Sequence, residues 1–329
     1  MEIKGFAVFE AIVILVLSGA LIYMNMEQST VTTEKITSAA LSNDTKLLSS
    51  RIYSGILEPQ SYLILNYEPL QEELKQNIEK NNLTISVYVE NLRSGAHMSI
   101  NGNQTYLSAS MMKIPLAILV MKKIERGEMT LDTPLAILDN DKTDTWGTLY
   151  NTTAQYLTVR QLLDRMLEDS DNTALNILYR NIDQDDFENL VYKYYGFQSN
   201  SVTTISFYNL FSSLYLSTVL EPQDSEYILQ MLTKTTFNLP QIADLPEDVV
   251  IAHKFGSRYK DDEKYFHDCG IIYDKELRIF YCIMTKDLEQ DTAIQVSAYL
   301  LNRIYIYSVQ TRIDLDNYKQ AELLSNNSK

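Results

Sequence analysis

The sequence predicts a mixed α/β fold of the α+β kind, in which an antiparallel five-stranded sheet is flanked by terminal helices and carries an inserted all-helical lobe. Strand-like segments occur at both ends of residues 68–312, and a block of helix-like segments lies between them. One sheet must therefore be assembled from both ends of this domain. An apolar stretch over residues 5–24 adds a transmembrane helix in front of it.

The N-terminal stretch 5–24 has twenty positions and a single charge, Glu10. A helix of this length spans roughly 30 Å, the thickness of a hydrocarbon core. A cleaved signal peptide and a buried soluble helix are the alternatives, but the length and the lack of a clear A-x-A site favour an uncleaved anchor. Lys4 weakly favours a short cytoplasmic end over residues 1–4. We expect a single-pass protein of the cell membrane with its folded domain on the extracytoplasmic side.

Residues 25–67 are rich in Ser, Thr and Asn, and we interpret them as a stalk or linker that leaves room for a short helix at about 46–56. Within the domain, helical spacing of apolar residues predicts helices over 69–79, 110–126, 158–168, 172–181, 187–194, 207–218 and 225–233, with a final amphipathic helix from about 294. Alternating or β-branched segments predict strands over 83–89, 97–101, 249–255, 266–273 and 278–285. A polar tail follows from residue 313 to residue 329. A cleft between sheet and lobe is the natural place for chemistry.

Composition excludes several classes of function. The net charge of −15 argues against nucleic acid as a partner, because phosphate contacts need clustered cations. The ten glycines are too widely spaced for either common nucleotide-binding loop. Three His and two Cys show no ligand spacing, so we expect neither a metal site nor a cofactor.

The two cysteines face each other across adjacent strands if the turn between them centres on Lys275 and Glu276. Outside the membrane a bridge between Cys269 and Cys282 is chemically allowed. Cross-strand bridges must meet strict distances, however, so two buried, unbonded cysteines are the expectation.

Three short segments carry residues suited to nucleophilic catalysis. Ser110 and Lys113 form an S-x-x-K at the start of a helix, where positions three apart share a face and a neutral lysine amine can take the proton of the serine hydroxyl. Considered alone, Ser110 is better interpreted as a helix N-cap. Ser257 to Lys260 repeats the S-x-x-K pattern in what we interpret as a loop.

The second segment, Ser170-Asp171-Asn172, lies between two predicted helices, where such residues are usually caps. In a functional interpretation Ser170 relays a proton and Asn172 holds a substrate carbonyl. The third segment begins at Lys254, at the end of a predicted strand, and the functional interpretation places it as a cation facing the cleft. Gly256 then permits close approach, and the Ser257 N–H is an oxyanion donor.

Taken together, the three segments resemble the S-x-x-K, S-D-N and K-T-G set of class A β-lactamases and penicillin-binding proteins, over about residues 69–312. The flanking sequences around Ser110, around Ser170 and at 267–273 are also similar to that family. The resemblance implies a membrane-anchored serine hydrolase with Ser110 as nucleophile, Lys113 as base and Ser170 passing the proton to the leaving nitrogen. It also implies that Lys254 binds a substrate carboxylate and that the N–H groups of Ser110 and Ser257 hold the oxyanion. Substrates would be β-lactams or D-alanyl cell-wall peptides.

Two departures from the family pattern bear on the activity. Phe255 replaces the threonine of K-T-G, so either Ser257 takes over its contact with the substrate carboxylate or the preferred substrate differs. The segment after residue 181 is short, and no carboxylate stands where the family places the glutamate that activates the deacylating water; Glu188 is the nearest candidate and is expected to be a solvated charge. We therefore expect slow deacylation. The alternatives are a D,D-peptidase-like enzyme and a binding or sensor module without efficient catalysis.

Trp146, the single tryptophan, falls between the first two motifs. Relatives often place an aromatic residue there at the mouth of the cleft, and an ordinary packing role is the alternative.

Overall fold

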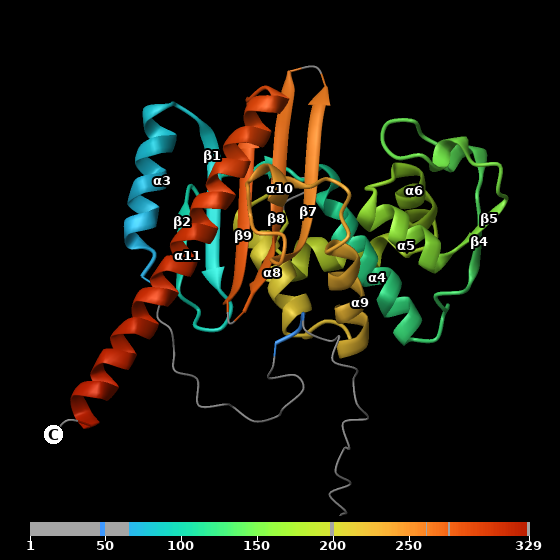
Figure 1. Cartoon of the computed structure of the whole chain (residues 1–329). Coiled ribbons are helices and arrows are strands. Elements are labelled where there is room, and N and C mark those ends of the chain that lie inside the picture. The colour runs from blue at the N-terminus through green and yellow to red at the C-terminus, as the bar shows by residue number, and fades with distance from the viewer. Residues whose placement is uncertain (1–46, 50–65, 198–200, 261, 276, 328–329) are drawn as a thin grey trace, which may run out of the picture. The chain divides into compact units, whose positions relative to one another are not determined.

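The computed structural model describes residues 47–49, 66–197, 201–260, 262–275 and 277–327, which all lie in the unit Leu47–Lys329 (Figure 1). The expected anchor over 5–24, its cytoplasmic end and most of the expected linker lie outside these residues. In the described part of the chain, no helix is both long enough and apolar enough to cross a membrane. Leu47 and Leu48, inside the expected linker, form bends rather than helix and are buried against the domain.

The central sheet joins strands from both ends of the domain. Its order is β2-β1-β9-β8-β7, and every neighbouring pair is antiparallel. The strands are β1 (Thr84–Asn91), β2 (His97–Ile100), β7 (Val250–Lys260), β8 (Glu263–Asp274) and β9 (Leu277–Lys286). The predicted five-stranded antiparallel sheet is therefore confirmed, and β7 is one of its edges.

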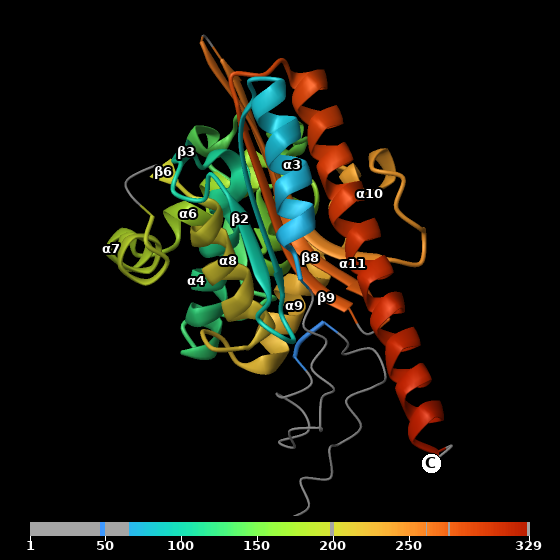
Figure 2. The same ribbon diagram turned by 90° about the vertical axis from the view of Figure 1, so that its left-hand side faces the viewer.

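Helices cover both faces of the sheet (Figure 2). One face carries α3 (Glu68–Lys80), α10 (Leu239–Ile242) and α11 (Gln290–Asn327); α11 extends through residues 313–327 of the expected polar tail. The other face packs against the inserted lobe, whose main helices are α4 (Lys113–Glu125), α5 (Val159–Glu168), α6 (Asn172–Arg180), α8 (Thr204–Tyr215) and α9 (Pro222–Leu232).

Several smaller elements differ from the prediction. One helix was expected over 187–194, but the structure has α7 (Gln184–Glu188) followed by a π-helical segment, Asn189–Tyr194. Two short ladders were not predicted: β3 (Tyr106–Leu107) with β6 (Ser201–Val202), and β4 (Pro134–Ala136) with β5 (Tyr156–Thr158). Strands of two or three residues are too short to show a period of two.

Side chains alternate between the two faces along β9. Phe280, Cys282 and Met284 join the core shared with the helical lobe, whereas Ile279, Tyr281 and Ile283 join the core shared with α3 and α11. Because both faces are covered, the strand is almost continuously apolar. The sheet is thus packed on both faces, and its edge strand β7 borders the site described below.

The β8–β9 hairpin places its two cysteines directly opposite each other. The register pairs Asp274 with Leu277 around the predicted turn and Cys269 with Cys282 further along. These two residues are fully buried and joined by a disulfide, with their Cα atoms 4.0 Å apart. The expectation of unbonded cysteines was wrong, because the hairpin itself brings the side chains within bonding distance.

Candidate active site

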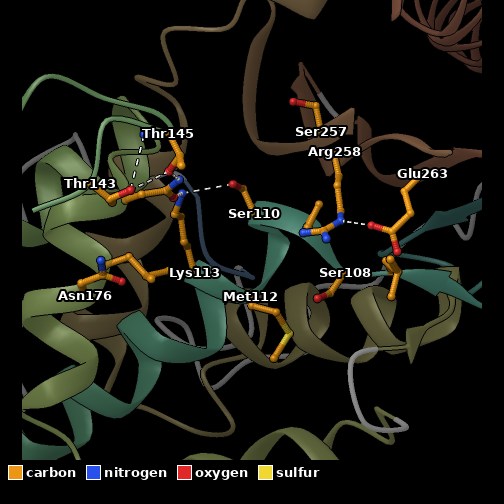
Figure 3. A pocket seen from close by; sticks show the side chains of 14 residues that line it. Ser108, Ser110, Met112, Lys113, Thr143, Thr145, Asn176, Ser257, Arg258 and Glu263 are labelled. Carbon is orange, nitrogen blue, oxygen red and sulfur yellow. Dashed lines mark hydrogen bonds and ion pairs between the residues drawn. The ribbon is translucent and has the colours of Figure 1, made fainter. Parts of the chain in front are cut away.

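Ser110 lies where the chain passes from β3 into α4. It belongs to a single 3₁₀ turn, Ala109–Met112, immediately before the first residue of α4. Ala109 has a φ of +47°, in the left-handed region that residues with a side chain seldom adopt. Such backbone strain is typical of functional sites. The Ser110 hydroxyl points toward the Lys113 amine (Figure 3).

Lys113 is the centre of a buried polar cluster. It is 1% exposed, and its Nζ lies 3.1 Å from Ser110 Oγ and 3.0 Å from Ser170 Oγ. It also donates to the Ser170 carbonyl at 2.6 Å and to Asn172 Oδ1 at 2.7 Å. Burial lowers the pKa of Lys113 to about 7, although the Asp171 carboxylate acts in the opposite direction. A substantial fraction of the amine is therefore neutral near pH 7 and able to accept a proton.

The S-D-N segment combines the capping and the functional interpretations. Asp171 caps α6 by accepting from the Ala174 N–H at 3.0 Å. Its other oxygen accepts from the N–H groups of Thr148 and Leu149, at 2.7 and 2.9 Å, which ties the preceding loop to the helix. Its neighbours Ser170 and Asn172 are thereby left free to meet the lysine.

Asn172 is fixed by the loop that precedes α6. Its Nδ2 donates to Thr145 Oγ1 at 2.8 Å, and its backbone N–H donates to the Trp146 carbonyl at 3.0 Å. The amide oxygen is therefore oriented toward Lys113. Nothing in the sequence around Thr145 or the neighbouring Thr143 marks them as site residues, and only the fold brings them here.

Gly256 on β7 lies against the turn that holds Ser110. A Cβ atom at this position would lie 3.2 Å from the Ser110 nitrogen and 3.1 Å from Met111 Cγ. Glycine thus permits the close approach that the sequence indicated, and it brings the edge strand beside Ser110. Ser257, the next residue, lines the cavity.

Lys254 is placed differently from the cation facing the cleft that the motif indicated. It is fully buried and lies outside the cavity lining; its Nζ donates to the Phe255 carbonyl at 3.1 Å. The Phe255 ring centre is 4.4 Å from the same nitrogen. Two effects lower the pKa of Lys254 well below its usual value: burial, which is the larger, and the charge of the nearby Lys113.

The second S-x-x-K, Ser257 to Lys260, lies in strand β7 and not in a loop as expected. Positions three apart on a strand belong to opposite faces. This segment therefore lacks the helical turn that brings Ser110 and Lys113 together.

The site opens into a cavity of about 650 Å³ (Figure 3). Its lining includes Ser110, Lys113, Asn172 and Ser257, together with a charged pair that the sequence did not single out, Arg258 and Glu263. These two residues lie on either side of the β7–β8 turn. Opposite charges on the two strands would have identified the pair if the sequence had predicted this hairpin. Among the described lining residues Glu263 is the one carboxylate. Glu188 is exposed at the end of α7, outside the lining, as expected of a solvated charge.

A buried histidine, His267, ties strand β8 to the segment that precedes Ser110. Burial lowers the pKa of His267 to about 4, so the ring is neutral at physiological pH. Its Nε2 lies 2.8 Å from the Leu107 carbonyl, which can only accept, and therefore carries the proton. This bond ties β8 to β3, three residues before Ser110.

The sequence profile of the β-lactamase enzyme family matches residues 69–305. The β-lactamase VEB-1 of Pseudomonas aeruginosa is 22% identical over 210 residues, which cover 56% of this chain and 70% of that protein. The structure of PBP-A shares the fold with a TM-score of 0.64 and 22% identity, over 72% of this chain and 96% of that one. A PBP-A mutant solved as an acyl-enzyme complex with penicillin G gives the same values. The TLA-1 extended-spectrum β-lactamase has a TM-score of 0.66 and 21% identity, over 73% and 99%.

Proposed function

Because the chain belongs to the β-lactamase enzyme family, we propose that it is a serine hydrolase that forms an acyl-enzyme at Ser110. One observation carries the proposal: Lys113 Nζ lies within hydrogen-bond distance of both Ser110 Oγ, at 3.1 Å, and Ser170 Oγ, at 3.0 Å. This chain of atoms leads from a nucleophile through a base to a second hydroxyl.

The reaction begins when Ser110 Oγ attacks an amide or lactam carbonyl and its proton passes to neutral Lys113. A bond forms between Oγ and the carbonyl carbon, and the carbonyl oxygen becomes an oxyanion. The N–H groups of Ser110 and Ser257 are the proposed donors to it, since Gly256 brings β7 against the Ser110 turn. The carbon–nitrogen bond then breaks as the proton moves from Lys113 through Ser170 Oγ to the leaving nitrogen, which leaves an ester on Ser110.

Hydrolysis of that ester is proposed to be slow. The deacylating water needs a general base, and the one carboxylate among the described lining residues, Glu263, is already paired with Arg258. General-base assistance is worth roughly 10²–10⁴-fold in rate. A long-lived adduct would suit either a sensor or a slow D,D-peptidase-like enzyme.

The proposed substrates are β-lactams or peptide-like amides of the cell wall. The acyl-enzyme of the PBP-A mutant with penicillin G, on a shared fold, supports the lactam class. Attachment to the outer side of a membrane through residues 5–24 is part of the proposal and rests on the apolar sequence of that segment.

Intact-mass spectrometry after exposure to penicillin G and, separately, to a fluorophosphonate tests this function. We expect one adduct per chain with each probe, loss of both adducts in Ser110→Ala, and a penicillin adduct that persists for hours. Absence of both adducts in the unsubstituted protein would refute the serine hydrolase. Rapid hydrolysis of the lactam would refute slow deacylation alone.

A further inference from the structure

We propose that the Phe255 ring, which contacts Trp146, keeps Lys254 out of the cavity, so that the site takes carbonyl substrates without a carboxylate beside the scissile bond. This inference rests on the proposed function and narrows its substrate class. It follows from three features: the aromatic contact, the burial of Lys254, and the charges that line the cavity.

The aromatic contact joins the helical lobe to the edge of the sheet. The ring centres of Trp146 and Phe255 are 5.8 Å apart, and Phe237 lies 4.6 Å from Phe255 on another side. Phe255 is only 3% exposed as a result. Trp146 is held in place because its Nε1 donates to the Asp169 carbonyl at 3.0 Å. Both ends of the contact are thus fixed, one on the lobe and one on β7.

Lys254 lies against the Phe255 ring of this contact. It has no exposed surface, it does not line the cavity, and its amine lies 4.4 Å from the centre of the Phe255 ring. Direct pairing of a substrate carboxylate with this amine would require a rearrangement that exposes Lys254. Lys254, which by the family resemblance would bind a substrate carboxylate, therefore does not face the cavity.

The described cations that do line the cavity already have partners. Arg258 is paired with Glu263, so the two together add no net charge. Lys113 donates to Ser170 and Asn172 within the reaction centre. A carboxylate entering the cavity would therefore have to compete with Glu263 for Arg258, because each described cation of the lining already has a partner.

The remaining described lining residues are uncharged. Leu107, Ala109, Met112 and Leu175 contribute to the wall of the cavity beside the polar reaction centre. Ser108, Thr143, Thr145 and Asn176 add hydroxyl and amide groups, so this part of the lining offers no charge to a ligand. The substrate class is therefore an amide, lactam or ester whose flanking acid is absent or masked.

Penicillin G and its methyl ester form a matched pair of probes, because they share the lactam and differ only in the carboxylate. The second-order rate constant of Ser110 acylation is measured for each by intact mass. We expect the ester to react at least tenfold faster than the acid in the unsubstituted protein. In Phe255→Thr, which removes the ring that lies against the Lys254 amine, the ratio should fall at least tenfold.

Trp146→Ala opens the contact from the lobe side and serves if Phe255→Thr does not fold; the same fall in the ratio is expected. Tyr156→Thr, an aromatic substitution at an exposed lobe position, is the matched control and should leave the ratio unchanged. A ratio below ten in the unsubstituted protein, or one that neither cleft variant lowers, would overturn the inference. Phosphonylation of Ser110 without reaction of either penicillin would overturn it too but leave the serine hydrolase standing. Failure of penicillin G, its methyl ester and the fluorophosphonate to modify the protein would refute the proposed function itself.

Discussion

Acylation of Ser110 should depend on pH through Lys113, because an ammonium must lose its proton before it can accept one from the serine hydroxyl. Burial lowers the pKa of Lys113 from an ordinary 10.5 to about 7. The neutral, active form is therefore lost as the pH falls through 7 and is fully populated above about 8. The acylation rate should rise with pH over this window and then level off.

The size of the effect follows from the same shift. With a pKa of about 7, half of the lysines are neutral at pH 7, whereas an ordinary lysine with a pKa of 10.5 would be neutral in only about 1 molecule in 3,000. The folded environment thus raises the population of the active base by roughly 10³-fold. Below pH 6 the rate should fall by nearly tenfold for each unit of pH.

The acylation reaction is quenched at set times and followed by intact-mass spectrometry, which gives the acylation rate constant between pH 5 and 9.5. An uncharged acyl donor is the appropriate probe, so that its own ionisation does not enter. Lys113→Arg keeps the positive charge but cannot deprotonate in this range, and its residual rate should show no inflection near pH 7. A flat profile for the unsubstituted protein, or an inflection close to pH 10, would refute Lys113 as the base.

Three further substitutions test parts of the structure. Gly256→Ala places a Cβ 3.2 Å from the Ser110 nitrogen, so the acylation rate should fall on the order of tenfold while the melting temperature changes little; an unchanged rate would contradict the close approach. Gly147 has a φ of +97° and lies where a Cβ would be 2.1 Å from an Asp171 oxygen, so Gly147→Ala should reduce the free energy of unfolding by about 1–3 kcal/mol or more in urea titrations, and full stability would contradict the loop geometry. Lys113→Met removes a buried amine whose pKa is about 7 when folded and 10.5 when unfolded; its cost to stability is constant below pH 7 and fades as the pH rises toward 10.5. The unfolding free energy of the variant relative to the unsubstituted protein should therefore fall by about 3 kcal/mol between pH 7 and 9.5, and a pH-independent difference would contradict the shifted pKa.

The architecture was predictable because both cores leave a periodic record in the sequence. Residues 278–285 are almost all apolar since they are covered on both faces, and the helices of the lobe show the spacing of a single buried face. The end of β7 was not predicted, because its residues show no apolar periodicity. Gly256, Ser257 and Arg258 resemble a turn, but an edge strand bordering a cavity tolerates small and polar residues.

Residues of the candidate site were likewise predictable only where their contacts are local in the sequence. Ser110 and Lys113 were found because their contact is local, three residues apart at the start of a helix. Thr145 contacts Asn172 from 27 positions away, and no local pattern predicts such a contact. The burial of Lys254 was also out of reach, since it depends on where Phe255 and its aromatic neighbours pack.

The most direct test of the central claim is to locate the acyl group. After reaction with an uncharged acyl donor, peptide mapping by mass spectrometry identifies the modified residue, with Ser110→Ala treated in parallel. We expect a single acyl group on the hydroxyl of Ser110 and none in the variant. An unmodified Ser110, or an equal yield of adduct in Ser110→Ala, would contradict the account.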